Sequence, residues 1–203
     1  MKMPVRFSLA ILLIGSAAGS PGAEAATVIT LGSGFSEPDG VAVDGSGNVF
    51  VADFGNNAVK EILALGGYTT VNTLGSGFSH PCGVAVDASG NVFVAAYFNQ
   101  AVAEILAAGG YTTVNLLGSG FSGPTGVAVD ASGNVFVADQ VNKTVLEILA
   151  AGDYTTVSTL ASGFNRPTGV AVDVSGNVFV ADQLSIFVTE ILAHDAIFAN
   201  GFE

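Results

Sequence analysis

Short stretches of alternating apolar and polar residues run along the chain, and the same alternation returns every 43 residues from Pro38 onward. One unit runs from Pro81 to Gly123 and contains four segments rich in Val, Ile, Thr, Tyr or Phe, which are GVAV, NVFVA, AVAEIL and YTTVNLLG. Gly, Asn, Asp and Pro separate these segments, as is typical of short β-strands joined by tight turns. The pattern therefore predicts four antiparallel strands in each unit.

Four such units follow one another, and they begin near residues 38, 81, 124 and 167. A tandem repeat of four short strands predicts an all-β fold, a β-propeller whose neighbouring blades bury one another's faces. A β-solenoid is the alternative, but the Ser-Gly turn after each first strand favours a tight antiparallel hairpin. One aromatic residue recurs in the second strand of every unit and is expected to pack between blades: Phe50, Phe93, Phe136 and Phe179.

The unit P-x-G-V-A-V-D-x-S-G-N-V-F-V-A-D-x-x-N-x-x-V resembles the NHL repeat. The residues that match the end of this motif are Asp53, Asp139, Asp182, Asn56, Asn99 and Asn142. The two departures are Ala96 in the place of the aspartate and Ser185 in the place of the asparagine. The resemblance covers nearly all of residues 26–203 and implies a β-propeller, usually one of five or six blades.

The two ends of the repeat array predict how the ring closes. Residues 27–35 (TVITLGSGF) copy the fourth strand of a unit, whereas the last unit stops after its third strand at Leu192. We expect the N-terminal strand to complete the last blade. The C-terminal residues 195–203 imitate the same segment and are the rival for this place. A third alternative is a ring that does not close within one chain and forms a homodimer.

The first residues differ in character from the repeats. Lys2 and Arg6 precede a short apolar run, Phe7–Gly15. Small residues around Ala25 then form a possible cleavage site. This order is typical of a secretory signal peptide over residues 1–25, because the apolar run is too short to span a bilayer. We expect residues 26–203 to be secreted or periplasmic.

Charge and cysteine content narrow the classes of partner. Five basic residues against 17 acidic residues give a formal net charge of −12, which makes nucleic acid and anionic membrane surfaces poor partners. No second apolar stretch is long enough to span a membrane. Cys82 is the single cysteine, so the chain forms no internal disulfide.

Repeat-equivalent loops differ in how much they vary. The turns at 44–48 and 64–68 are nearly identical in their other copies, and we call the end of the propeller that carries them the uniform rim. The loops at 36–40 and 53–58 vary from copy to copy and lie at the opposite end, the variable rim. Recognition of an asymmetric partner needs different residues from each blade, so the variable rim is the predicted ligand-binding face. Its candidate residues are Glu37, Asp39, Phe54, His80, Cys82, Tyr97, Phe98, Gln140, Arg166 and Gln183.

Four of these candidates are of metal-ligand type, namely Glu37, Asp39, His80 and Cys82. They come from two units without a compact spacing, so we predict no metal site and no cofactor. Some proteins similar to NHL-repeat propellers are lyases, and that resemblance implies histidines around the axis. This chain has only His80 and His194, His194 lies in the C-terminal tail, and neither has an evident catalytic partner. The interpretation is a secreted, non-catalytic propeller that binds a protein, a peptide or a glycan. The alternative is a small metal-dependent lyase or hydrolase.

Overall fold

The computed structural model describes residues 27–193, and the regular structure there is β-strand apart from one short 3-10 turn. The expected signal peptide and the C-terminal residues 195–203 lie outside the described residues. The contacts divide the chain after Thr30, and residues 27–30 carry no regular structure. Among the residues that the structure describes, no helix has the length and apolar character needed to cross a membrane.

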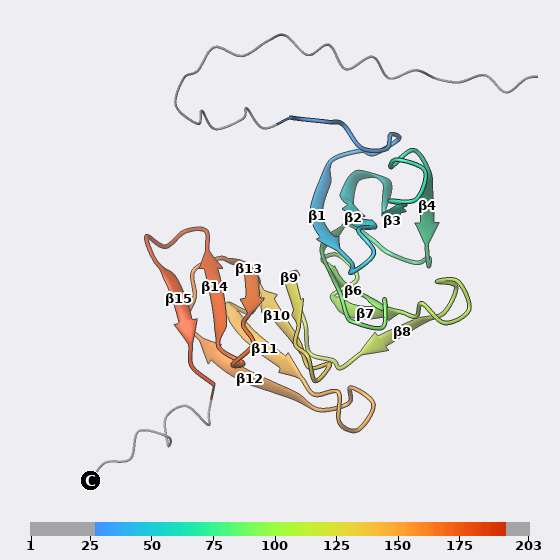
Figure 1. Cartoon of the computed structure of the whole chain (residues 1–203). Helices are drawn as coiled ribbons and strands as arrows, with labels where there is room; N and C mark the ends of the chain where they lie inside the picture. The colour runs from blue at the N-terminus through green and yellow to red at the C-terminus, as the bar shows by residue number, and fades with distance from the viewer. Residues whose placement is uncertain (1–26, 194–203) are drawn as a thin grey trace, which may run out of the picture. The chain divides into compact units, whose positions relative to one another are not determined.

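The strands form four antiparallel sheets, and in each sheet the strands pair in chain order (Figure 1). The first sheet contains β1 (Pro38–Val43), β2 (Val49–Asp53), β3 (Ala58–Ile62) and β4 (Val71–Leu74), with the 3-10 turn η1 (Phe54–Asn56) after β2. The second contains β5 (Pro81–Val86), β6 (Val92–Ala96), β7 (Ala101–Ile105) and β8 (Val114–Leu117). The third contains β9 (Pro124–Val129), β10 (Val135–Asp139), β11 (Thr144–Ile148) and β12 (Val157–Ser162). The fourth contains β13 (Pro167–Val172), β14 (Val178–Asp182) and β15 (Val188–Ile191).

The turn between the first two strands of each sheet shows why these strands pair. The Asp87 carboxylate accepts hydrogen bonds from the backbone N–H groups of Ser89 (2.9 Å) and Asn91 (2.8 Å) and from the Asn91 side-chain amide (3.0 Å). Gly90 has a φ of +84°, which a residue with a Cβ adopts only with strain. The other three sheets repeat these bonds, so the turn stabilises itself wherever it occurs.

The aspartate that ends the second strand holds the loop that enters its own sheet. The Asp139 carboxylate accepts hydrogen bonds from the backbone N–H of Ser122 at 2.8 Å and from the side-chain amide of Asn142 at 3.0 Å. In the second sheet Ala96 stands in the place of the aspartate, and the Asn99 side-chain oxygen accepts the entering loop's N–H, that of Ser79, at 2.6 Å. The departure from the motif therefore leaves the loop tethered.

Apolar residues from neighbouring sheets form the core. We call the side of a sheet that packs on the next sheet its forward face and the opposite side its backward face. Fully buried Phe93, on the forward face of the second sheet, packs against Val135 on the backward face of the third. Phe50 and Phe136 occupy the same position in their sheets and are buried, as we expected, whereas Phe179 in the last sheet is half-buried.

The innermost strands of neighbouring sheets approach too closely for side chains. Contacts join β1 with β5, β5 with β9, and β9 with β13. A Cβ placed on Gly83 would lie 2.4 Å from the carbonyl oxygen of Thr125, and one on Gly40 would lie 2.4 Å from that of Cys82. A carbon atom that is not bonded to the oxygen atom cannot lie so close to it, because 2.4 Å is well inside the van der Waals contact distance. The glycine that opens each Gly-Val-Ala-Val segment is therefore required by the packing of one sheet on the next.

The closure that we expected from the N-terminal strand is not formed. Residues 27–37 carry no strand, and the last sheet has three strands among the described residues. The Gly32 N–H donates instead to the Tyr68 carbonyl at 3.1 Å, as the Gly75 N–H does to that of Tyr111 at 2.9 Å. This segment therefore behaves like the connections between sheets. Within the described ranges β1 and β13 form no interface comparable with those between neighbouring inner strands.

Candidate binding site

A concavity of about 750 Å³ lies where the inner strands meet the variable rim. Every sheet contributes three consecutive inner-strand residues to its wall, at 39–41, 82–84, 125–127 and 168–170. The remaining lining comes from the variable loops: Phe54, Tyr97, Phe98, Gln140, Arg166 and Gln183. Because all four sheets supply different side chains, the wall is asymmetric although the scaffold is repetitive.

The structure brings eight of the ten candidate residues around this one concavity. Glu37 and His80 are the two that do not line it. Both occupy the same position in their loops and both have a left-handed backbone, with φ of +49° and +52°. The strained backbone of His80 is held in place by a hydrogen bond of 2.8 Å from its N–H to the side-chain oxygen of Asn57.

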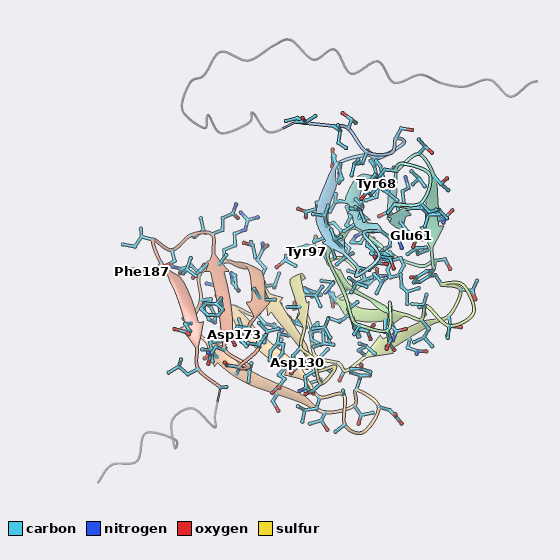
Figure 2. All side chains as sticks on the ribbon, viewed as in Figure 1. Glu61, Tyr68, Tyr97, Asp130, Asp173 and Phe187 are labelled. Carbon is cyan, nitrogen blue, oxygen red and sulfur yellow. The ribbon has the colours of Figure 1, made fainter. Side chains whose placement is uncertain are left out.

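Four rings from the first two sheets form a continuous aromatic ladder at one side of the concavity. The His80 ring packs edge-on against Phe54, with centroids 4.5 Å apart, and against Phe98, with centroids 4.6 Å apart. Phe98 in turn contacts Tyr97 at 5.1 Å. Figure 2 shows Tyr97, which follows β6, and its hydroxyl lies 3.4 Å from the side-chain oxygen of Gln140. His80 therefore positions two aromatic rings that face the concavity and does not contact its interior.

Cys82 and Asp39 are neighbours on the inner strands of the first two sheets. Burial, together with the negative charge of Asp39 and a hydrogen bond to its carboxylate, raises the pKa of the Cys82 thiol to about 12. The thiol is therefore protonated at neutral pH, and its Sγ lies 3.5 Å from the His80 carbonyl oxygen. A protonated thiol is a poor nucleophile and a poor metal ligand.

The loops of the third and fourth sheets contribute polar side chains on a fixed backbone. The Arg166 N–H donates to the Asp182 carboxylate at 2.6 Å, and the Gln183 N–H donates to the Arg166 carbonyl at 2.9 Å. The Arg166 and Gln183 side chains line the concavity above this backbone. The concavity thus offers a carboxylate from the first sheet, aromatic rings from the first two, and a guanidinium and amides from the last two.

The candidate set missed part of the wall. The inner-strand glycines and valines also line the concavity, and the signal in the sequence that indicates them is the recurring GVAV segment. Thr125 was also missed, and its hydroxyl oxygen lies 3.2 Å from each of two backbone carbonyl oxygens, those of Ala138 and Pro167. Within residues 27–193 no group of three or more His, Cys, Asp or Glu side chains is placed to hold a metal ion.

Antiparallel sheets of up to four strands that pack face to face, with their inner strands side by side, are the blades of a β-propeller. The sequence matches the NHL repeat family over residues 35–62, 121–147 and 164–185. The chain is therefore an NHL-repeat β-propeller, and both the family resemblance and the fold class expected from the sequence are confirmed.

Solved structures of the same fold come from proteins of different activities. Virginiamycin B lyase from Staphylococcus aureus is similar with a TM-score of 0.58 and 11% identity, over 77% of this chain and 56% of that one. A hydrazine synthase from Kuenenia stuttgartiensis is similar with a TM-score of 0.65 and 14% identity, over 85% of this chain and 48% of that one.

A nidogen–laminin complex is similar with a TM-score of 0.61 and 18% identity, over 77% of this chain and 65% of that one. The chain thus spans about half to two thirds of the length of these structures, and the likeness is one of fold. No curated protein sequence matches the chain.

Proposed function

We propose that this chain is an exported, non-catalytic NHL-repeat propeller that binds an extended segment of a partner protein in the concavity of the variable rim. The observation that carries the proposal is the contrast between the repeats. At equivalent loop positions, the blades present different side chains, and these side chains line one shared concavity. A rigid scaffold with variable loops is the usual arrangement of a recognition surface.

The chemistry of the wall favours a peptide segment as ligand. Tyr97 and Phe98 offer apolar area on rings that their neighbours already hold, so binding them costs little conformational entropy. Gln140 and Gln183 offer amide groups that match the hydrogen-bonding groups of a peptide backbone. The similar fold in the nidogen–laminin complex occurs in an assembly of proteins, which supports this class of partner.

The negative charge of the chain favours peptide ligands that are neutral or basic. The formal net charge is −12, and Asp39 adds a carboxylate to the wall at the first blade. Arg166, one of five basic residues in the chain, lines the wall before the fourth blade. We therefore infer a neutral to basic segment whose positively charged residue lies towards Asp39 and whose acidic group or carbonyl lies towards Arg166.

The alternative of a metal-dependent lyase has less support. Within residues 27–193 no group of three or more His, Cys, Asp or Glu side chains converges on one point, and the His80 ring packs between Phe54 and Phe98. The likeness to virginiamycin B lyase is one of fold and carries no residue correspondence at 11% identity.

Binding to a displayed library of random peptides, followed by affinity measurement of the selected peptides, tests the proposal. Tyr97→Ala and Phe98→Ala are each expected to weaken binding at least tenfold, because they remove preformed apolar contacts. Phe187→Ala is the matched control, since Phe187 is an exposed aromatic of the variable rim that does not line the concavity (Figure 2).

Equal affinity of the Phe98→Ala and Phe187→Ala variants would contradict the placement of the site. Selection of no peptide, together with specific signals on an array of immobilised glycans that the Tyr97→Ala variant loses, would change the ligand class from protein to glycan. An export assay with the intact leader tests the location, and we expect the first residue of the exported chain at or near Ala26.

A further inference from the structure

Packing between neighbouring blades buries apolar side chains along the array, but the two outermost faces among the described residues stay exposed. They are the forward face of the fourth blade and the backward face of the first, and each is of the kind that packs on the other inside the array. In the first three blades the forward face carries a buried phenylalanine, alanine and valine, which in the second blade are Phe93, Ala95 and Val102, each with 0% exposure. The equivalent residues of the fourth blade are Phe179, which is half-buried, and Ala181 and Val188, which are exposed. Val188 is 72% exposed.

The backward face of the first blade shows the same exposure. In the second and third blades the first valine of this face is buried, as Val84 and Val127 are at 7% and 8% exposure. The equivalent Val41 in the first blade is 67% exposed, and Val43 beside it is 60% exposed. Each end of the array therefore presents, among the described residues, the half of an interface that the chain completes three times internally.

A single glycine provides an independent indication of what packs on the fourth blade. The inner glycine of each of the first three blades lies against a backbone carbonyl oxygen of the next blade, with its notional Cβ 2.4, 2.4 and 2.8 Å away. Gly169 is the fourth member of this series, and a Cβ there would meet only the Ala181 Cβ at 3.4 Å among described atoms. Its φ is not in the left-handed region, so nothing in the described fold requires glycine at this position.

We propose that two copies of this chain associate head to tail, with the forward face of the fourth blade of each copy packed on the backward face of the first blade of the other. The contact repeats the geometry of the internal interfaces, and the carbonyl that approaches Gly169 is that of Asp39 in the second copy, the repeat equivalent of Cys82, Thr125 and Thr168. This proposal does not depend on the proposed ligand.

Two copies satisfy the geometry of the fold. The described residues of each copy supply four blades, and those of two copies supply eight, which lies within the range of about four to eight blades found in propellers. Three copies would supply twelve and exceed it. Both faces are used once in each copy, so the pair closes on itself and leaves neither apolar face in water.

The mass of the purified exported chain in solution, by sedimentation or native mass spectrometry at micromolar concentration, tests the proposal. We expect twice the chain mass. Gly169→Val is expected to give the mass of one chain with an unchanged circular dichroism spectrum, because the added side chain blocks the partner and meets no close backbone within its own fold. Gly83→Val is the contrasting variant and is expected to prevent folding, since the same change there strikes the Thr125 carbonyl.

Charged substitutions on the two faces provide a second, milder test. Val43→Glu and Val188→Glu each place a carboxylate at an exposed position and are expected to separate the copies without unfolding them. Val174→Glu is the matched control, because Val174 is fully exposed on a turn of the uniform rim and belongs to neither face. Mixing the Val43→Glu and Gly169→Val chains restores a two-copy species through one intact interface, which is specific to head-to-tail packing.

Four outcomes would overturn the proposal. They are a single-chain mass for the unchanged protein, a two-copy mass that survives both Gly169→Val and Val188→Glu, a failure of the mixed variants to associate, and species that grow without limit as concentration rises. A single-chain mass that becomes a two-copy mass when residues 194–203 are deleted would assign the face of the fourth blade to the C-terminal segment instead.

Discussion

The two rims of this propeller differ in how their loops are held in place. At the uniform rim each Asp-x-Ser-Gly-Asn turn is satisfied by its own carboxylate and asparagine, within four residues of sequence. At the variable rim the loops are tethered across 16 to 26 residues, as in the bond from Ser122 to Asp139 or from Lys60 to Gly34. In each of these bonds the entering loop contributes a backbone atom, so most side chains of that loop are free to differ.

The sharpest way to separate the rims is to remove one turn carboxylate. Asp87→Ala deletes three hydrogen bonds of 2.8 to 3.0 Å and leaves the Ser89 and Asn91 N–H groups without their acceptor. We expect the free energy of unfolding to fall by about 2 kcal/mol, measured by denaturant titration. Asp39→Ala at the variable rim is the control. A loss from Asp39→Ala as large as that from Asp87→Ala would contradict the division between the rims.

Acid titration of the unmodified chain separates the buried glutamates of the blade faces from the hydrogen-bonded aspartates of the rims. Burial raises the pKa of Glu104 and of Glu147, whose side chains lie on forward faces. An acid with a raised folded pKa opposes folding above that pKa, so lowering the pH from 7 towards about 4.3, the ordinary pKa of Glu, relieves the cost. We expect the thermal midpoint to rise slightly over this range, as repulsion within the acidic chain also declines.

Below that range the hydrogen-bonded aspartates of both rims lose their charge, as Asp173 in a turn of the uniform rim and Asp53 at the variable rim show. Burial opposes ionisation of Asp53, but hydrogen bonds from Lys60, Asn56 and the Ser36 backbone lower its pKa overall. A lowered folded pKa contributes stability above about 3.9, the ordinary pKa of Asp, that is lost as the pH falls through the folded value. The thermal midpoint should therefore fall below about pH 4. A midpoint that declines steadily from pH 7 would contradict the assignment of these groups.

A smaller effect is expected from the exposed end of the aromatic ladder. Phe98 is 61% exposed, so Phe98→Ala removes little buried area and should change the free energy of unfolding by less than about 0.5 kcal/mol. The same substitution is expected to weaken ligand binding, which is the separation of stability from recognition that the two rims imply. A large loss of stability would show that the ladder supports the blades.

The smallest effect concerns Cys82. Its thiol pKa of about 12 predicts very slow alkylation by iodoacetamide at pH 7.5 in the folded protein and rapid alkylation after unfolding. Mass spectrometry of the intact chain over time measures both rates. Rapid native alkylation would place an ionised thiol in the concavity and would revive metal or nucleophilic chemistry there.

The repeat pattern was sufficient to predict the fold, because the signals for the strands, the turns and the core phenylalanine recur in every 43-residue unit. It also placed most candidate residues together, since strand direction alone decides which loops share a rim. It did not predict the enclosure of His80, because the two rings that enclose it come from different loops. The prediction that residues 27–35 complete the last blade was also wrong. These residues resemble both the fourth strand of a unit and the connection that follows that strand, and in the structure they act as a connection.

The turns of the uniform rim have a consequence for how the chain acquires its structure. Their hydrogen bonds are complete within five residues, so the hairpin of β1 and β2 closes without waiting for distant sequence. Each blade then packs on the one before it, and nearest-neighbour packing lets folding begin in any blade and spread along the chain. During synthesis the first blades can form while later ones are still being made. A gain or loss of one whole unit would leave every other turn, tether and interface intact, so the number of blades can change more easily than the blade itself.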